Sequence, residues 1–334
     1  MVPMMHIAID AEGGDFAPGN IVKGALSAAC QLKCGLTFVG NRRKIENQIS
    51  QQNIPQAVDV QFVDAGEVIE MSEDPVAAFR SKSRSSVKQS VELVASGKAD
   101  AVFSAGNTGA TVLAAHATFG LLPGVHRPAL VTVMPSRRGN VVLLDAGANV
   151  QCRPQHLLQF AIMGCVYARL LLAVLQPKVG LLSIGQEAIK GNELTRESHS
   201  LLRKSTLDFI GNIEAKDLYN GEADVIVCDG FTGNITLKVS EGLVEVLEEL
   251  LSEELRRTVF TRFNALLLKN SFKRFRRRID YSEVGGALLL GVNGLCVIGH
   301  GSSSVKAVEN AVKLAHQFAN EKFVDRLGSE IISK

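Results

Sequence analysis

The residues in this sequence that could do chemistry gather in six glycine-rich turns that also hold aspartate, asparagine, serine or threonine. Each turn follows an apolar run, and the turns span residues 10–15, 104–109, 145–149, 183–192, 229–234 and 299–302. Glycine lets the backbone approach a ligand closely, while the polar side chains can cap the following helix or donate to an oxyanion. A helix N-terminus also favours an anion. One such turn is more often structural than functional, but six together predict a site for a phosphate-bearing or carboxylate ligand.

These turns lack the motifs of several common enzyme classes. No GxGxxG follows a strand, and there is no GxxxxGK[ST] P-loop and no GxSxG nucleophile elbow. The seven histidines form no metal-ligand pair, and only His300 lies inside a glycine-rich turn, where it could be structural or bind substrate. The six cysteines are scattered without a CxxC pair, which is typical of reduced, buried thiols in a cytosolic protein. The sequence therefore predicts no metal site and offers no obvious covalent nucleophile.

The composition is that of a globular protein with a large core. The chain has 334 residues, 46% hydrophobic and 21% charged, enough for one large α/β unit or two closely joined halves. A net charge of +2 argues against wholesale nucleic-acid binding. No signal peptide is expected, and no apolar run reaches the roughly 18–20 residues that span a bilayer. The most apolar stretch, residues 160–175, contains Arg169 and is expected to form a buried core helix.

Short apolar strands alternate with helical patterns along almost the whole chain. Strands are expected at residues 6–10, 36–40, 60–66, 99–104, 129–135, 140–145, 178–185, 207–213 and 223–229. Helices are expected at residues 20–32, 41–52, 83–96, 111–122 and 305–319. Near-continuous apolar strands separated by helices predict a largely parallel sheet covered by helices on both faces. In such a sheet ligands bind beyond the carboxyl ends of the strands, which is where the six turns lie.

One segment departs from this alternation. Between Leu255 and Ile279 the chain has nine basic residues and no acidic one, and its apolar residues recur at helical spacing. We expect residues 250–280 to form a protruding, basic amphipathic helical insertion within a single α/β unit of residues 1–334. Its charge could be the solvated face of an ordinary packed helix, or it could be a surface for an anionic membrane or an acidic partner.

With these turns in view, the sequence resembles the PlsX-type phosphate acyltransferases (fatty acyl-ACP:phosphate acyltransferases). The resemblance runs through nearly the whole chain and rests on six motifs in the expected order: "DAEGGDFAPG", "SAGNTGA", "LLDAGAN", "LLSIG…KGN", "CDGFTGN" and "GHGSSS". Two positions and one stretch depart from the family pattern, the stretch being "FRSKSRSS", which has fewer basic residues than usual. Glu12 stands where the family usually has methionine, and Gln151 stands where an acidic residue is common.

The resemblance implies a reaction, a fold and partners. Members transfer a long-chain acyl group from acyl carrier protein to orthophosphate, forming acyl phosphate for phospholipid synthesis, and need no cofactor. They are similar in fold to phosphotransacetylases and to isocitrate- and isopropylmalate-type dehydrogenases, with an αβα architecture. They act as homodimers at the cytoplasmic face of the membrane, where they are peripherally attached. We expect the same of this chain, with no nucleic-acid partner.

This reaction fits the residues at hand. Orthophosphate is itself the nucleophile, and the leaving thiolate is a modest base with a typical pKa of about 8.5, so the site needs neither a catalytic serine nor a strong general acid. It must hold a dianion against a thioester and stabilise the tetrahedral oxyanion. By resemblance, Lys190 would pair with phosphate or the oxyanion, and Asn234 would donate to the thioester oxygen. The expected substrate-binding residues are Asp10, Gly13, Gly14, Asp15, Ser104, Gly106, Asn107, Thr108, Asp145, Asn149, Asp229, Thr232, Gly233 and His300.

The basic segment has two candidate tasks in this account, docking of acidic acyl carrier protein and attachment to an anionic leaflet. The residues expected to form that surface are Arg262, Phe263, Leu267, Lys269, Lys273, Arg274, Arg276, Arg277 and Arg278. Three other functions stay open: a short-chain phosphotransacetylase acting on acyl-coenzyme A, a scaffold that binds carrier protein without turnover, and a dehydrogenase of the similar fold. The dehydrogenase would need a nucleotide site that the sequence lacks.

Overall fold

The computed structural model describes residues 4–52, 58–257, 275 and 285–332. Its strands are β1 (His6–Asp10), β2 (Gly35–Gly40), β3 (Val60–Asp64), β4 (Ala101–Ser104), β5 (Ala129–Ser136), β6 (Gly139–Leu144), β7 (Lys178–Ser183), β8 (Asp208–Glu214), β9 (Val225–Val227), β10 (Ala287–Leu290) and β11 (Cys296–Ile298). Its helices are α1 (Gly19–Leu32), α2 (Arg42–Ser50), α3 (Pro75–Ser81), α4 (Ser86–Ala95), α5 (Thr108–Phe119), α6 (Pro154–Leu171), α7 (Glu193–Lys204), α8 (Gly230–Arg256), α11 (Val305–Asn320) and α12 (Phe323–Ile332).

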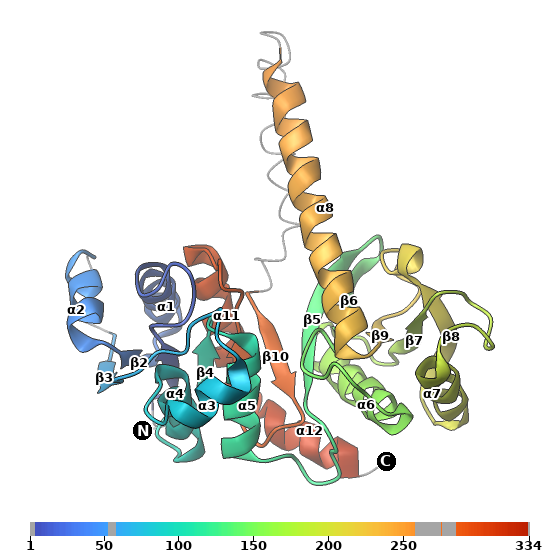
Figure 1. Ribbon diagram of the computed structural model, residues 1–334, viewed down its shortest axis with the longest axis horizontal. Coiled ribbons are helices and arrows are strands. Elements are labelled where there is room, and N and C mark those ends of the chain that lie inside the picture. Colours follow the sequence, from blue (N-terminus) through green and yellow to red (C-terminus); the bar gives the residue numbers. More distant parts are fainter. Residues whose placement is uncertain (1–3, 53–57, 258–274, 276–284, 333–334) are drawn as a thin grey trace.

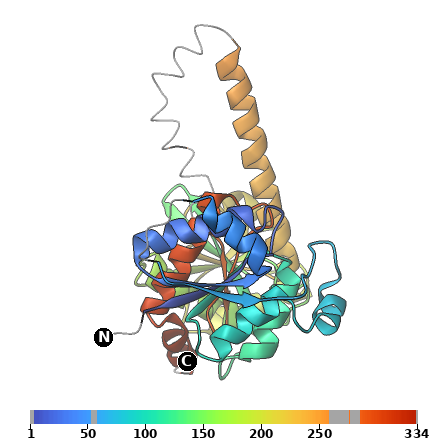
Figure 2. The same ribbon diagram turned by 90° about the vertical axis from the view of Figure 1, so that its left-hand side faces the viewer.

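The described strands form one continuous sheet in the order β3-β2-β1-β4-β11-β10-β5-β6-β9-β7-β8, with helices on both faces (Figures 1 and 2). Successive side chains of β1 alternate between the two faces, as a strand requires. Ile7 and Ile9 join the core under α1 and α11, whereas Ala8 joins the core under α4 and α5. The predicted αβα architecture is confirmed.

The centre of the sheet is antiparallel, which the sequence did not predict. β10 runs antiparallel to both β11 and β5, and β5 and β6 form a hairpin in which Ser136 pairs with Gly139. The strands on either side of this centre are parallel among themselves. Because three antiparallel steps separate the two flanks, their strands point in opposite directions. The turns after β1, β4 and β11 therefore leave one edge of the sheet, and those after β6, β7 and β9 leave the other.

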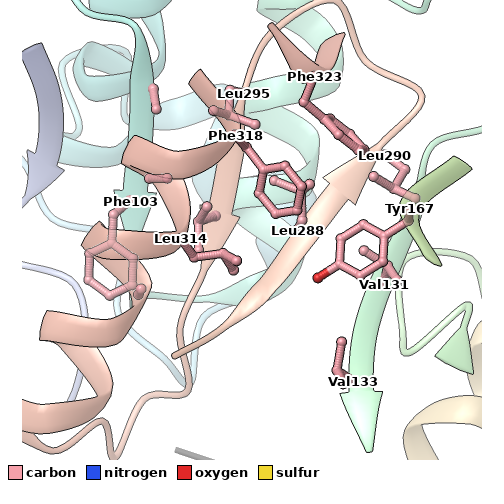
Figure 3. Close-up of a cluster of buried hydrophobic side chains, with 14 of the residues drawn as sticks. Phe103, Val131, Val133, Tyr167, Leu288, Leu290, Leu295, Leu314, Phe318 and Phe323 are labelled. Atoms are coloured by element: carbon pink, nitrogen blue, oxygen red, sulfur yellow. The ribbon is translucent and has the colours of Figure 1, made fainter. Parts of the chain in front are cut away.

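An aromatic cluster joins the two C-terminal helices to α6 and the central strands (Figure 3). The rings of Phe318 and Phe323 lie 4.6 Å apart, and Tyr167 of α6 lies 5.5 Å from Phe318. Arg169, at the solvent side of α6, forms an ion pair with Glu330 of α12. The expectation of a buried helix over residues 160–175 is confirmed as far as Leu171, where α6 ends, since Tyr167 is 1% exposed, whereas Leu175 is 86% exposed. No helix in the described part of the chain is long and apolar enough to cross a membrane.

Helix α8 projects far from the body of the molecule (Figures 1 and 2). It begins at Gly230, twenty residues before the predicted insertion at 250, so the protruding element is continuous with the polar turn after β9. Large apolar side chains are exposed along it, at Phe231, Ile235, Val239, Leu243, Val246, Leu247, Leu250 and Leu251. The residues predicted to form a basic surface, Arg262, Phe263, Leu267, Lys269, Lys273, Arg274, Arg276, Arg277 and Arg278, lie outside the described residues.

Candidate active site

Asp145, which follows β6, organises the turn that it begins through both carboxylate oxygens. Oδ1 accepts hydrogen bonds from the backbone amides of Leu130, Gly147 and Ala148 at 2.9–3.1 Å. Oδ2 accepts from the backbone amide of Asn149 at 2.7 Å and from its side-chain amide at 2.8 Å. Burial raises the pKa of Asp145, and these hydrogen bonds act in the opposite direction because they favour the carboxylate. The hydrogen-bonding capacity of Asp145 is used on the protein's own chain.

The first turn of α8 rests directly on the Asp145 turn. Asp229 caps the helix, because its carboxylate accepts from the backbone amide of Thr232 at 2.9 Å and from its hydroxyl at 2.8 Å. The amide of Gly230 donates to the carbonyl of Asn149 at 2.8 Å. A Cβ at position 233 would lie 1.9 Å from the carbonyl oxygen of Asp145, so this approach requires glycine. The two turns therefore form one rigid support for the start of α8.

A second polar pair lies between the turns after β1 and β4. Asp10 is 2% exposed and accepts from the hydroxyl of Ser104 at 2.6 Å, and that hydroxyl accepts from the amide of Gly106. A Cβ on Gly13 would lie 2.7 Å from both Asp10 Oδ2 and the Gly106 nitrogen. Burial raises the pKa of Asp10. These residues pack the two glycine turns against each other. Gly14, with φ of +108°, leads to Asp15, whose amide donates to Gly301.

Asn107 caps α5 and fixes a neighbouring loop. Its side-chain oxygen accepts from the amide of Ala110 at 3.1 Å. Its side-chain nitrogen lies within 3.1–3.4 Å of the carbonyl oxygens of Glu70, Met71 and Glu73. Asn107 therefore serves the scaffold, and one consequence is that Met71 is held against the cavity described next.

The cavity lies on the face of β5, β10 and β11, between α5 and the base of α8, and has a volume of about 400 Å³. Its apolar lining comprises Met71, Leu130, Ala146, Leu237, Ala287, Ile298 and Ala307. Its polar lining comprises Asp15, Thr108, Thr132, Asn234, Lys238, Glu241, His300 and Ser303. The N-terminal turns of α5 and α11 reach it through Thr108 and Ala307, so two helix dipoles favour an anion there.

Four of the predicted site residues meet in this cavity, from both flanks of the sheet: Asp15, Thr108, Asn234 and His300. The side chains of Thr108 and Asn234 have no hydrogen-bond partner among the described residues. The remaining predicted residues do not line it, namely Asp10, Gly13, Gly14, Ser104, Gly106, Asn107, Asp145, Asn149, Asp229, Thr232, Gly233 and Lys190. Apart from Lys190, these hold or pack the turns that carry the four lining residues.

The prediction missed Lys238, which lines the cavity one helical turn beyond Asn234. Its ammonium lies 2.7 Å from Nε2 of His300 and 3.4 Å from the carboxylate of Glu241. The signal was present in the sequence, because residues four apart on a helix share a face. Lys238 is four residues after Asn234, and Glu241 is three residues after Lys238, a spacing that also keeps side chains on one face.

Lys190 lies on the exposed loop after β7, at the far flank of the sheet. The loop is anchored where the side chain of Asn212 donates to the carbonyl of Glu187 at 2.9 Å. Asn192 then caps α7. Two isoleucines beside the lysine, Ile184 and Ile189, are 83% and 78% exposed.

Two cysteines near the start of α8 are unsuited to nucleophilic attack. Burial raises the pKa of Cys152 to about 12, and it raises the pKa of Cys228 well above the ordinary thiol value. A thiol attacks as its thiolate, which these environments disfavour. Within the described ranges, no group of three or more histidine, cysteine or acidic side chains could hold a metal ion.

Glu12, one of the departures from the family pattern, turns away from the cavity. Its carboxylate accepts from the amide of Asn41 at 2.9 Å and lies 3.8 Å from the ammonium of Lys44. The negative charge is therefore held at the start of α2. A second departure, Gln151, is exposed.

Sequence comparisons place the chain in a family. Residues 5–326 match the family described as "Fatty acid synthesis protein". The phosphate acyltransferase of Thermodesulfovibrio yellowstonii is 45% identical over 328 residues, covering 98% of this chain and 94% of that protein. The phosphate acyltransferase of Pelotomaculum thermopropionicum is 46% identical over 329 residues, covering 98% and 96%.

Solved structures agree on the fold. A phosphotransacetylase from Streptococcus pyogenes matches with a TM-score of 0.66 at 18% identity, covering 96% of this chain and 95% of that one. A branched-chain phosphotransacylase from Enterococcus faecalis matches with a TM-score of 0.55 at 16% identity, covering 95% and 99%. The family match and the two relatives show that the chain belongs to the PlsX family of phosphate acyltransferases.

Proposed function

We propose that this phosphate acyltransferase moves a long-chain acyl group from acyl carrier protein to orthophosphate, forming an acyl phosphate for phospholipid synthesis. One observation carries the proposal. The cavity between α5 and α8 combines apolar and polar lining residues, and the side-chain amide of Asn234 has no partner among the described residues. Apolar lining suits the methylenes of an acyl chain, and a free amide suits the thioester oxygen.

In the reaction, a phosphate oxygen attacks the thioester carbonyl carbon. A carbon–oxygen bond forms, the tetrahedral oxyanion collapses, and the carbon–sulfur bond breaks with its electron pair leaving on the thiolate. Asn234 donates to the carbonyl oxygen as negative charge develops on it. By the resemblance, Lys190 would pair with the phosphate or the oxyanion, but it lies on the loop after β7 and does not line this cavity. The other predicted residues that do not line the cavity support it by fixing the turns.

The long-chain donor is preferred over short-chain acyl-coenzyme A because the described lining offers seven apolar residues and one lysine, and no arginine, to a substrate. A nucleotide-bearing donor carries several phosphates and would call for more cations at the site. The phosphotransacetylase neighbours support the fold alone, since they are under 25% identical.

The partners follow from the protruding element. We propose that the apolar side chains along α8 pair with a second copy in a homodimer, since an exposed stripe of this length marks an interaction surface. Changing Leu243 and Leu247 to glutamate should yield monomers in light scattering, and a dimer of unchanged strength would rule this out.

The basic residues beyond α8 would steer acyl carrier protein and hold the enzyme at the inner face of the membrane, giving a cytoplasmic, peripheral location. Liposome binding that survived charge reversal at Arg276, Arg277 and Arg278 would contradict the electrostatic part of this proposal.

The deciding experiment measures thiol release from purified long-chain acyl carrier protein, with and without orthophosphate. Release that requires both protein and phosphate, with acyl phosphate recovered, supports the proposal. Acyl-coenzyme A of short chain length serves as the competing donor. If the folded protein binds the acyl carrier protein but releases no thiol, the scaffold alternative replaces it.

A further inference from the structure

Among the described residues that line the cavity there is one ammonium, that of Lys238, and two neighbours contact it. Lys238 is the only lysine or arginine among the described residues that line the cavity, where the acids are Asp15 and Glu241. Its ammonium lies 2.7 Å from Nε2 of His300 and 3.4 Å from the Glu241 carboxylate. The Lys238 side chain is 52% exposed, so it remains open to a ligand.

His300 is itself fixed to its turn. Its carbonyl oxygen accepts from the backbone amide of Ser303 at 2.9 Å and from the Ser303 hydroxyl at 2.5 Å. Its Nδ1 lies 2.8 Å from the hydroxyl of Ser302. A lysine ammonium only donates hydrogen bonds, so Nε2 must be the acceptor nitrogen of a neutral imidazole. In that tautomer Nδ1–H can donate a hydrogen bond to the Ser302 hydroxyl at 2.8 Å, and the backbone amide of Ser302, at 3.3 Å from Nδ1, then makes no hydrogen bond with it.

We propose that Lys238 is the residue that binds the phosphate dianion in this cavity, and that His300 is the positioning residue for its ammonium. The assignment deepens the proposed function and rests on it. The contact with Glu241, at 3.4 Å, is longer than the 2.7 Å contact with His300, so an anion can replace it, and Lys238 lines the same cavity as Thr108 and Asn234. Lys190, proposed for the same anion by resemblance, is absent from the cavity lining.

Two variants and a control test the role of Lys238. Lys238→Met removes the charge and keeps much of the side-chain length, whereas Lys238→Arg keeps the charge. Lys216→Met is the matched control, because Lys216 also pairs with a glutamate, at 2.9 Å to Glu214, outside the cavity. We expect Lys238→Met to raise the KM for phosphate at least tenfold and to leave the KM for the acyl donor within twofold. Lys238→Arg should recover part of the phosphate affinity, and Lys216→Met should change neither constant.

The KM for phosphate and the KM for the acyl donor also distinguish a positioning role of His300 from a purely structural one. His300→Phe removes the acceptor and should raise the KM for phosphate by a smaller factor than Lys238→Met does. In a protein that already carries Lys238→Met, His300→Phe should add little, because its partner is gone. Equal, independent effects of the two changes would overturn the positioning role.

Phosphate binding measured directly keeps this inference separate from the proposed function. Titration of inorganic phosphate, followed by calorimetry or by phosphorus NMR, requires no acyl donor and no turnover. Parent protein that binds phosphate at least tenfold more tightly than Lys238→Met supports the assignment even if no thiol is ever released. Equal binding by the parent and Lys238→Met, or no binding by the folded parent, overturns it even if the parent proves an active acyltransferase.

Discussion

Two polar turns of this protein contain the same residue types, but the side-chain amide of the asparagine in one donates two hydrogen bonds and that of the asparagine in the other has no partner among the described residues. In the turn after β6, Asp145 accepts five hydrogen bonds, and the Asn149 side chain donates to both Asp145 and the carbonyl of Pro128. At the base of α8, Asn234 has no partner in the described part of the chain and faces a cavity. Residue types are therefore enough to predict that a turn is polar. Whether a polar side chain supports the fold or binds a ligand depends on whether its hydrogen bonds are already made within the protein.

The physical reason lies in the cost of burying polar groups. A buried donor or acceptor without a partner costs about 1–3 kcal/mol, so the interior turn must satisfy itself during folding. A donor at a cavity wall is solvated until a ligand replaces the water, so it can be left free for function. Removing Asp145 should therefore reduce stability, and removing Asn234 should reduce activity.

The largest effect is expected from Asp145→Ala. This change leaves several buried amides without an acceptor, so we expect a loss of unfolding free energy on the order of 4 kcal/mol or more. Denaturant unfolding measures it, with the exposed Asp208→Ala as the control, which should stay within about 0.5 kcal/mol of the parent. A mildly destabilised Asp145→Ala protein would mean that the turn does not depend on this carboxylate.

Asn234→Ala should reduce activity and leave stability unchanged. A lost oxyanion donor costs on the order of 3–4 kcal/mol in barrier, so turnover should decrease at least a hundredfold while the melting temperature is unchanged. Lys190→Ala should decrease turnover to the same degree if the role suggested by the resemblance is correct. The exposed helical change Asn47→Ala serves as control and should affect neither property. Normal turnover in either site variant would remove that residue from the mechanism.

A smaller difference in stability is expected between alanine substitutions at two glycines of α8. Gly233→Ala places a Cβ against the Asp145 carbonyl, where neither backbone can yield, and overpacking of this kind costs about 1–3 kcal/mol. A Cβ at position 242 would meet no atom within 4 Å. Gly242→Ala should therefore stabilise the protein by up to about 1 kcal/mol, because alanine favours a helix. If the unfolding curves of Gly233→Ala and Gly242→Ala shifted in the same direction, the close packing of α8 against the Asp145 turn would not limit stability.

The sequence predicted the layers of the fold and the turns well, because strand and helix periodicities are local. It did not predict the antiparallel centre, because the pairing of β10 with β5 joins segments more than 150 residues apart in the sequence. That centre decides which turns meet. It directs the turns of the two flanks to opposite edges, so that a cavity on the sheet face, and not a single edge, collects Asp15, Thr108, Asn234 and His300.

Lys238 was missed for a related reason. The prediction was limited to the residues directly after each strand, and in this region the last of them is Asn234. Lys238, on the next turn of the helix, lines the same cavity. The strand-end aspartates were predicted to bind substrate, but three of them, Asp10, Asp145 and Asp229, hold the turns. Their residue type alone does not distinguish the two roles. That choice depends on partners such as the amide of Leu130, which lies fifteen residues away from Asp145 in the chain.

The smallest effect comes from Asp10, the buried counterpart of Asp145 on the other flank. Burial raises its pKa above the ordinary value of 3.8, so the folded protein favours the protonated acid. The stability that this group contributes is therefore full below about pH 4 and is lost as the pH rises through the raised pKa, at about 1.4 kcal/mol for each unit of difference. Asp10→Asn keeps an acceptor for the Ser104 hydroxyl and carries no charge.

The Asp10→Asn protein should therefore gain in unfolding free energy relative to the parent as the pH is raised from 4 to 8. Denaturant unfolding across that range measures the difference, with Asp208→Asn, an exposed aspartate, expected to give a nearly constant one. Parallel profiles for Asp10→Asn and the parent would mean that Asp10 stays ionised in the fold, as a carboxylate compensated by its neighbours would.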